Sequence, residues 1–162
     1  MSSLTVANTD DTILQALDTT LTAATVSGAA LFAQVAHAGS IEEAKQVKFT
    51  KSPTVVLIYQ GTEDHKSTDL IWGQVCKVDL LLAAKDTTAA LRRTAITRLI
   101  AGAKDAIATD PPSDARAFGE GETLHRRLEW ESPSLDLITN QPWAVAVLPL
   151  RVAYVVSTAT AR

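Results

Sequence analysis

The sequence predicts an α+β fold: a two-layer α/β arrangement with two main helices packed on one face of a mostly antiparallel or mixed β-sheet. Three apolar runs have the β-branched content or the alternation that is typical of strands, and they lie near residues 53–60, 74–84 and 143–156. Two longer segments, at about 10–24 and 87–108, repeat apolar residues at helical spacing. Helices on one face of a sheet bury these surfaces most simply, so we expect a single domain over 1–162 with its core at about 10–156.

The composition is that of an ordinary globular protein. The chain has 162 residues, of which 46% are apolar and 20% are charged. Its 15 basic and 18 acidic residues give a net charge of −3, which argues against a nucleic-acid coat or a polybasic membrane anchor. The single cysteine, Cys76, excludes an internal disulfide. Neither a signal peptide in Met1–Asp11 nor a membrane helix is predicted, so we expect a soluble protein in the cytoplasm.

The first helix is expected over 10–24. Asn8 and Thr9 are suited to cap it, and Asp10 and Asp11 would then lie in its first turn, where negative charge is favoured. Gly28 ends the apolar pattern, whose stripe consists of Ile13, Leu14, Leu17 and Leu21.

Two short elements follow this helix. Residues 30–39 fit either a strand or a short helix, because periodicity alone does not decide, and we favour a strand that ends at Gly39. Ser40 followed by Glu42 and Glu43 resembles a helix start, which predicts a short helix over 41–47.

The first of the three apolar strands is expected to open at Pro53 and to end at Gly61. A proline is tolerated at the mouth of a strand, where its missing N–H is not needed. The apolar run from Val55 to Tyr59 indicates a strand covered on both faces. The polar segment 60–70 is expected to be a solvated, mobile loop, which contains Glu63, Asp64, His65 and Lys66.

The second apolar strand, 71–84, shows period-two alternation. Lys77 and Asp79 point to one side, and the other side carries Cys76, Val78, Leu80, Leu82 and Ala84. At least the first half of this strand should therefore face water or a partner on one side. Because Cys76 lies on the apolar side, we expect it to be a core residue and not a nucleophile.

The longest helix, 87–108, is expected to begin at Asp86 or Thr87 and to stop before Pro111-Pro112. Its apolar stripe consists of Leu91, Ala95, Leu99 and Ala103, widened by Ile96, Ile100 and Ile107. Four basic residues lie outside the stripe: Arg92, Arg93, Arg98 and Lys104. They form either a solvated helix face or a surface that meets acidic residues of a neighbouring subunit.

The last third of the chain contains a long connection and further strands. Residues 109–122 combine prolines and glycines with charged side chains, which predicts a long, mobile connection. Strands are expected at 123–131, 135–138 and 143–156, and the tail 157–162 is expected to be frayed. Pro149 within the final strand predicts an edge or a bulge on at least one of its sides.

No motif in the sequence predicts catalysis. The three histidines, His37, His65 and His125, have no metal-ligand spacing to another ligand residue. Gly119-Glu120-Gly121 lacks the Lys-Ser/Thr of a phosphate-binding loop. We therefore expect neither an enzyme nor a bound cofactor or metal. The tryptophans at or near strand ends are candidates to anchor the core or an interface: Trp72, Trp130 and Trp143.

Several segments together form a recognisable pattern: Leu31-Phe32-Ala33-Gln34-Val35, the short helix around Glu42–Gln46, the strand Ser52–Gly61, the alternating strand Trp72–Ala84 with its following helix, and the final strand Trp143–Val156. In this pattern the chain resembles the tail terminator (tail completion) proteins of long-tailed bacteriophages, and most closely the Mu-like small tail protein family. The resemblance covers about residues 10–156 and consists of apolar patterns, not of catalytic signatures.

The resemblance implies a structural role for a sheet with helices packed on it. Such proteins form a ring, commonly hexameric, that caps the finished tail tube, ends its polymerisation and meets the neck proteins on the head side. In contractile tails the ring also touches the last sheath ring. The implied partners are further copies of the chain, the tail tube protein, a neck or connector protein and DNA that passes through the lumen without specific binding. The implied location is the tail–neck region of the virion, after assembly in the host cytoplasm.

This interpretation assigns candidate contacts in three places. Subunit, tube or neck contacts are expected at Lys77, Asp79, Arg92, Arg93, Arg98 and Arg151. A first partner loop would contain Glu63, Asp64, His65 and Lys66, and a second loop, lining the lumen or meeting a partner, would contain Asp110, Asp114, Arg116, Glu120 and Glu122. A neck or head-completion connector is the alternative within the same class. A small-molecule binding domain or an unrecognised enzyme is a third hypothesis, which a cleft with convergent polar groups would favour.

Overall fold

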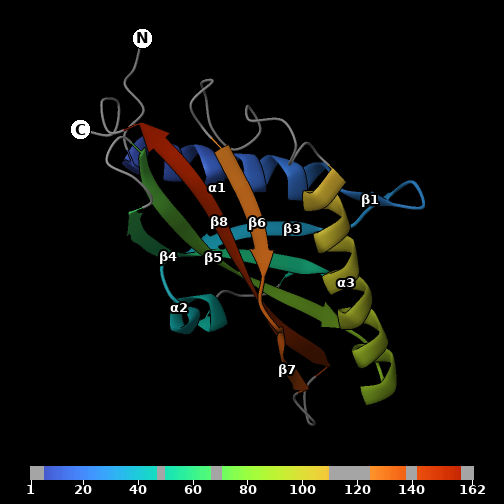
Figure 1. The fold of residues 1–162 in the computed structure, drawn as a ribbon. Coiled ribbons are helices and arrows are strands. Elements are labelled where there is room, and N and C mark those ends of the chain that lie inside the picture. Colours follow the sequence, from blue (N-terminus) through green and yellow to red (C-terminus); the bar gives the residue numbers. More distant parts are fainter. Residues whose placement is uncertain (1–5, 47–49, 67–70, 110–124, 138–141, 158–162) are drawn as a thin grey trace.

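The computed structural model describes residues 6–46, 50–66, 71–109, 125–137 and 142–157 (Figure 1). Helices and strands fill most of these ranges. In chain order they are α1 (Val6–Ala23), β1 (Thr25–Val26), β2 (Ala29–Ala30), β3 (Gln34–Ala38), α2 (Ile41–Gln46), β4 (Thr54–Lys66), β5 (Ile71–Lys85), α3 (Ala89–Thr109), β6 (His125–Trp130), β7 (Ser134–Leu137) and β8 (Trp143–Ser157). The predicted α+β class is confirmed.

The main sheet is mixed and has the order β3-β4-β5-β8-β6, with β7 also paired to β8. Only β3 runs parallel to its neighbour β4, and the other pairs are antiparallel. Its three central strands are the three apolar runs of the sequence, and they are long: 13 residues in β4 and 15 each in β5 and β8. Side by side, these strands form the rigid centre of the molecule.

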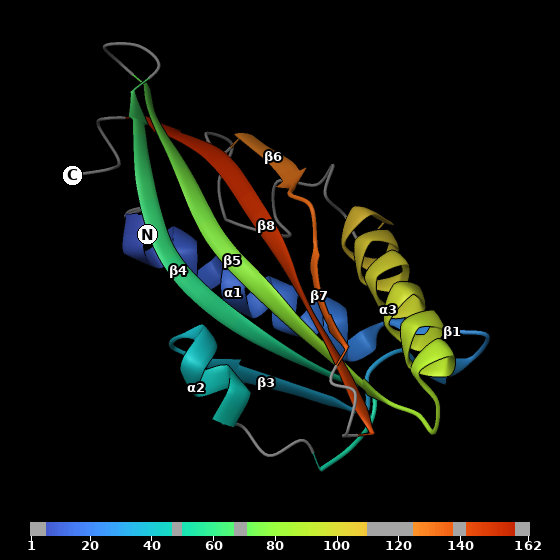
Figure 2. The same ribbon diagram turned by 90° about the horizontal axis from the view of Figure 1, so that it is seen from below.

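Helices α1 and α3 cover one face of this sheet (Figure 2). Their buried side chains meet the inward residues of the strands, such as Leu57 of β4 and Leu80 of β5. The helix side of this core consists of Ile13, Leu17 and Leu21 from α1 and of Ile96, Leu99, Ala103 and Ile107 from α3. Within the described ranges, none of the helices combines the length and the apolarity that a bilayer-crossing segment requires.

Helix α2 lies on the opposite face and covers only one end of it (Figures 1 and 2). Its Ala44 packs on Val56, Ile58 and Leu81, all of which are fully buried. The apolar run of β4 is therefore covered on both sides, as predicted. Two hydrogen bonds similar to a capping box hold the start of α2: Ser40 Oγ accepts one from the Glu43 N–H, and the Glu43 carboxylate accepts one from the Gly39 N–H, each at 3.1 Å.

The predicted loop at 60–70 is wrong for residues 60–66, which continue β4 and pair with β5. Gly61 does not end the strand. Gln60 is an extra residue in a β-bulge, and Gly61 beside it has φ = +96°, a conformation that only glycine adopts readily. The bulge lets the strand continue beyond its apolar part. The polar composition of residues 60–66 therefore led to the wrong prediction of a loop. Residues 67–70 lie outside the described part of the chain.

The predicted strand at 30–39 begins later, at Gln34. Before it, β1 and β2 form a small hairpin whose two turn residues, Ser27 and Gly28, both have positive φ. This is the geometry of a type I′ turn, which matches the twist of the flanking strands. The Ser27-Gly28 dipeptide is the sequence signal for that turn.

Both long helices begin at residues other than those predicted. Helix α1 starts at Val6, so Asp10 and Asp11 are not in its first turn. Helix α3 is capped by Thr88, whose Oγ1 accepts a hydrogen bond from the Leu91 N–H at 3.2 Å, and not by Asp86 or Thr87. Leu91, which was expected in the apolar stripe, is 48% exposed.

Pro149 interrupts pairing on one side of β8, as predicted. Its carbonyl accepts a hydrogen bond from the Glu131 N–H at 3.1 Å. Glu131 lies in the neighbouring segment of the same chain, between β6 and β7. A strand residue directs its N–H and C=O to the same side, so the missing N–H of Pro149 falls at this break. Strands β6 and β7 lie where they were expected. The connection 109–122, beyond Thr109 itself, and the tail 158–162 lie outside the described residues.

Candidate functional site

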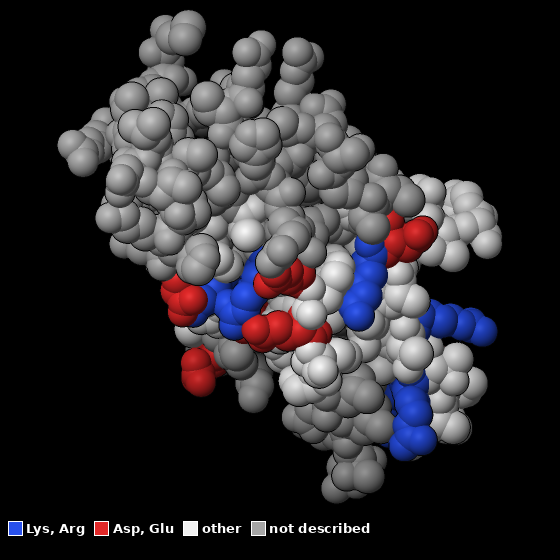
Figure 3. Space-filling view, in the orientation of Figure 1, with Lys and Arg blue, Asp and Glu red and all other residues white. Residues whose placement is uncertain are grey.

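Charged side chains lie in a cluster on the sheet face opposite α1 and α3, beyond the end that α2 covers (Figure 3). The pairing register places Gly61, Lys77, Arg151 and Glu129 in one row across β4, β5, β8 and β6. We call this cluster the open face; it consists of Gln60, Glu63, Lys77, Asp79, Glu129, Glu131 and Arg151. Three predicted contact residues, Lys77, Asp79 and Arg151, are thus brought together, and Glu63 of the predicted first loop joins them.

Ion pairs and one amide hydrogen bond organise the open face. Lys77 binds Glu63, and the Arg151 Nε lies 2.6 Å from Glu131 Oε1. In both pairs the cation is the more buried partner: the side chains of Lys77 and Arg151 are 24% and 30% exposed, against 62% and 48% for Glu63 and Glu131. The outermost charges are therefore carboxylates. Among the described side chains of the open face there are four carboxylates and two cations, so this described part of the surface is acidic.

The neighbours of these groups shift their pKa values. Burial raises the pKa of the Asp79 carboxyl, although the hydrogen bond that Gln60 donates (3.2 Å) and the nearby Arg151 oppose this shift. The hydrogen bond from Lys77 lowers the pKa of Glu63, and the one to Glu131 raises the pKa of Arg151. Asp79 therefore takes up a proton at a higher pH than an ordinary aspartate, while Glu63 keeps its charge to a lower pH.

The outer face of helix α3 is basic between Ala90 and Ala101, and the exposed acid Asp105 follows one turn later on the same arc. Arg93 and Arg98 are both exposed there, and Leu91 is exposed beside Arg98 on the helical wheel. Between the two arginines runs a row of small exposed residues at helical spacing, namely Ala90, Thr94, Thr97 and Ala101. The hydroxyls of Thr94 and Thr97 donate to the carbonyls of Ala90 and Arg93, at 3.1 and 2.8 Å. We call these seven residues the outer face of α3.

Arg92 was predicted as a contact residue, and this prediction is wrong. Its side chain is only 6% exposed and lies at the core-facing position that Leu91 was expected to hold. One guanidinium nitrogen donates to the Asp86 carbonyl at 3.2 Å, while Nε has no hydrogen-bond partner among the described residues. Its long aliphatic stem explains how an arginine occupies this site.

Trp130, a candidate core or interface anchor, and Lys104, expected outside the apolar stripe of its helix, lie together at the edge of the core. Trp130 packs against the main core, which confirms an anchoring role for at least one tryptophan. The Lys104 ammonium lies 5.8 Å from the centroid of the Trp130 ring, a cation–π contact that ties α3 to β6. Trp143 is half-buried, and the side chain of Trp72 lies outside the described part.

A buried polar cluster under α1 was not predicted. Asp10 is 3% exposed, and its carboxylate accepts hydrogen bonds from the hydroxyls of Tyr59 and Thr62 on β4. Burial, and next to it the hydrogen bond to Asp10, raise the pKa of Tyr59 to about 12. Cys76 is fully buried in the main core, which confirms that it is a core residue, and burial also raises the pKa of its thiol. One signal was present in the sequence: Asp10 lies three residues before Ile13, on the same helical stripe.

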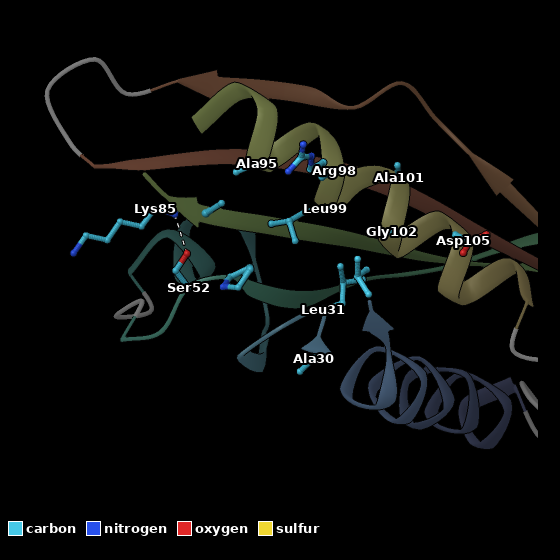
Figure 4. Close-up of a pocket in the computed structure, with 13 residues that line it drawn as sticks. Ala30, Leu31, Ser52, Lys85, Ala95, Arg98, Leu99, Ala101, Gly102 and Asp105 are labelled. Carbon is cyan, nitrogen blue, oxygen red and sulfur yellow. Dashed lines mark hydrogen bonds between the residues drawn. The ribbon is translucent and has the colours of Figure 1, made fainter. Parts of the chain in front are cut away.

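A largely apolar groove of about 770 Å³ lies between the β1–β2 hairpin, α3 and the ends of β4 and β5 (Figure 4). Leu31 and Leu99 line it, and Arg98 and Asp105 lie along α3 at its rim. Gly102 lets the Leu31 side chain pack closely on α3 in this wall, since a Cβ at that position would lie 2.9 Å from Leu31 Cδ1. The polar groups around the groove do not converge on one point, so it offers no acid–base constellation.

The structure describes few or no side-chain contacts for the remaining predicted site residues. His37 is exposed and pairs with Asp18. Asp64, His65 and Lys66 belong to β4, but their side chains lie outside the described part, as does the side chain of His125. The candidates of the second loop lie outside the described residues altogether: Asp110, Asp114, Arg116, Glu120 and Glu122. Among the side chains that are described, no three metal-ligating residues lie close enough together to hold an ion.

Comparisons with known proteins do not assign the chain to a family. No model of a known protein family matches the chain, and a search of the curated proteins found no matching sequence. The open face and the outer face of α3 are therefore the features from which function is inferred.

Proposed function

We propose that the chain is a structural subunit of a phage tail, which forms a ring on the end of the tail tube, stops its polymerisation and joins the tail to the neck. The observation that carries this proposal is the set of three long central strands, whose face opposite α1 and α3 is charged and is covered, within the described part of the chain, by α2 at one end. The pattern of apolar segments that resembles tail terminator proteins supports the same role. Ring formation, the tube, the neck and DNA in the lumen are all part of the proposal.

Element lengths support an assembly role. A strand of 15 residues spans about 50 Å, whereas helices of 18 and 21 residues span about 27 and 32 Å. Each helix alone is shorter than the central strands, yet the inward side chains are buried from Gln74 to Ala84 in β5 and from Ala144 to Val152 in β8. The surface that these long strands leave for neighbouring molecules is therefore the charged face opposite α1 and α3, and such a surface is what a ring subunit requires.

A connector of the neck or head would use the same features, and it remains the alternative within this class. The apolar groove favours a different hypothesis, a small-molecule binding domain, because its volume is in the range of ligand sites. We rank that hypothesis lower, since the lining of the groove lacks convergent polar groups.

Mass measurement of the purified protein tests the proposal, first alone and then mixed with tail tube protein. We expect a ring, or a monomer that becomes a ring on tubes, and tubes that stop growing when the protein is added. A tube polymerisation reaction without the protein is the control for length. A monomer that neither binds tubes nor changes their length distribution would contradict the proposal.

A further inference from the structure

The acidic open face and the basic outer face of α3 lie on different parts of the same molecule. In Figure 3 basic side chains lie along α3, with an acidic patch beside the uppermost of them, and they are separate from the mixed cluster over β4, β5 and β8. Two surfaces of opposite charge that are held apart by a rigid sheet and its packed helix cannot neutralise each other within one chain. They are placed to meet between two copies.

We propose that the outer face of α3 in one copy docks on the open face of the next copy. This inference deepens the proposed ring and depends on it for its biological purpose. Because the two surfaces differ, the contact is heterologous: each copy uses its helix towards one neighbour and its sheet towards the other. Repetition of one heterologous contact gives a ring where the rotation closes.

Charge complementarity identifies a second copy as the occupant. Arg93 and Arg98 stand about 7.5 Å apart along the helix axis and on either side of its exposed arc. The open face offers Glu63 and Glu131 as its outermost charges, on different strands of the sheet. Each of these carboxylates already has one cation beneath it, and an arginine from above would bind oxygen lone pairs that the buried cation does not use.

The shape of the helix surface fits a sheet. The row Ala90, Thr94, Thr97 and Ala101 has no long side chain, and both threonine hydroxyls are already bonded to carbonyls of the same helix. The centre of the helix face is therefore low and needs no polar partner, so a pleated surface can approach it closely. Leu91, 48% exposed at the edge of this row, supplies an apolar side chain that docking would bury.

Charge reversal tests this pairing directly. The double variant R93E/R98E and the double variant E63K/E131K each place like charges at the contact. We expect each to weaken self-association by about tenfold or more, measured as the dissociation constant by analytical ultracentrifugation at low salt. The combined quadruple variant restores opposite charges and should recover most of the wild-type association, and so should an equimolar mixture of the two double variants.

Matched reversals of exposed charges elsewhere are the controls. K51E/K85E and D11K/E42K change the net charge by the same amounts without touching either face, and both should associate like the wild type. Circular dichroism melts confirm that each variant is folded. The milder variants R93Q/R98Q and E63Q/E131Q keep the test decisive if a reversal disturbs folding, because each should weaken association by a smaller factor.

Three results would overturn the docking inference. They are a wild-type chain that stays monomeric both alone at low salt and high concentration and in the presence of tail tubes, folded double variants that associate normally, and a quadruple variant that associates no more tightly than the double variants. A protein that caps tubes while ignoring all reversals would lose this inference and keep the proposed function. If self-association responds to the charge swap as expected but the protein never changes tube length, the docking inference stands and the proposed function is contradicted.

Discussion

Asp10 shows how a single residue ties α1 to the sheet. Its carboxylate is almost fully buried, and it accepts hydrogen bonds from Tyr59 and Thr62 at the point where β4 bulges. A buried carboxylate is tolerated only where donors satisfy it. The polar cluster therefore fixes how the helix lies on β4 and sets the position of the Gln60–Gly61 bulge.

Replacing Asp10 by alanine should destabilise the protein by about 1–3 kcal/mol, because two buried or half-buried hydroxyls lose their acceptor. The exposed neighbour Asp11 is the matched control, and Asp11→Ala should change the free energy of unfolding by less than about 0.5 kcal/mol. Urea unfolding of both variants measures the difference. Equal stabilities would show that the buried carboxylate is not part of what holds the helix.

Tyr59 should make stability depend on alkaline pH. Its pKa is raised to about 12 in the folded protein, whereas an unfolded tyrosine has a pKa of about 10. The folded state keeps a proton that the unfolded state releases, so the contribution of Tyr59 is complete below about pH 10 and is lost as the pH rises towards 12. In Tyr59→Phe the free energy of unfolding should fall less steeply over this range. Parallel pH profiles for the two proteins would contradict the assignment.

Among the elements, β4 depends most on one special backbone conformation. The bulge at Gln60 and the positive φ of Gly61 let an apolar strand continue as a polar one. A Cβ at Gly61 would meet nothing within 4 Å, so any cost of a side chain there comes from the backbone and not from crowding.

Gly61→Ala should therefore destabilise the protein by about 1–2 kcal/mol, since alanine disfavours the left-handed region. Gln60→Ala at the adjacent bulge position is the control, and it should cost less because Gln60 gives up only its hydrogen bond to Asp79. Denaturant unfolding compares the two. An unchanged free energy of unfolding in Gly61→Ala would mean that the bulge relaxes to another register.

The elements also show what the sequence could and could not predict. Alternation along Cys76–Ala84 and the spacing of Ile13, Leu17 and Leu21 are local signals, and both led to the correct elements and buried faces. Residues 60–66 were mistaken for a loop, because their strand character depends on pairing with β5 and not on their own composition. Arg92 was placed at the surface for the same reason: which side of a helix turns inward is decided by the sheet it packs on.

The candidate surfaces were predictable only in part. Lys77 and Asp79 were identified as the polar side of a strand, and Arg93 and Arg98 as the polar side of a helix. Their meeting with Glu63 and Glu131 follows from the pairing of β4, β5 and β8, which no local pattern specifies. Residue types thus indicated polar faces, while the sheet order assembled one of them into a site.

At the scale of the whole molecule, the arrangement of layers predicts which strands require the most free energy to unfold locally. β5 is flanked by β4 and β8 along the sheet, and its residues 80–84 are buried on both faces. β3 pairs only with β4 within the described part of the sheet, and Ala44 is the only buried side chain among those of α2 that the structure describes.

Amide hydrogen exchange should reflect this order. The central residues of β5 should exchange only through global unfolding, whereas the amides of β3 and α2 should exchange through smaller openings, with protection lower by about tenfold or more. Exchange followed by mass spectrometry or NMR measures both groups in one sample. Equal protection in β3 and β5 would mean that the sheet opens as one unit.

The antiparallel pairing of β5 with β8 extends over all 15 residues of each strand. Tension applied along the strand axis at opposite ends of this pair would load the hydrogen bonds between β5 and β8 in shear. Many of these hydrogen bonds would then have to break at the same time and not one after another. Tension across the strands would instead open the sheet at an edge. The molecule is therefore mechanically anisotropic, stiff along β5 and β8 and weaker at right angles to them.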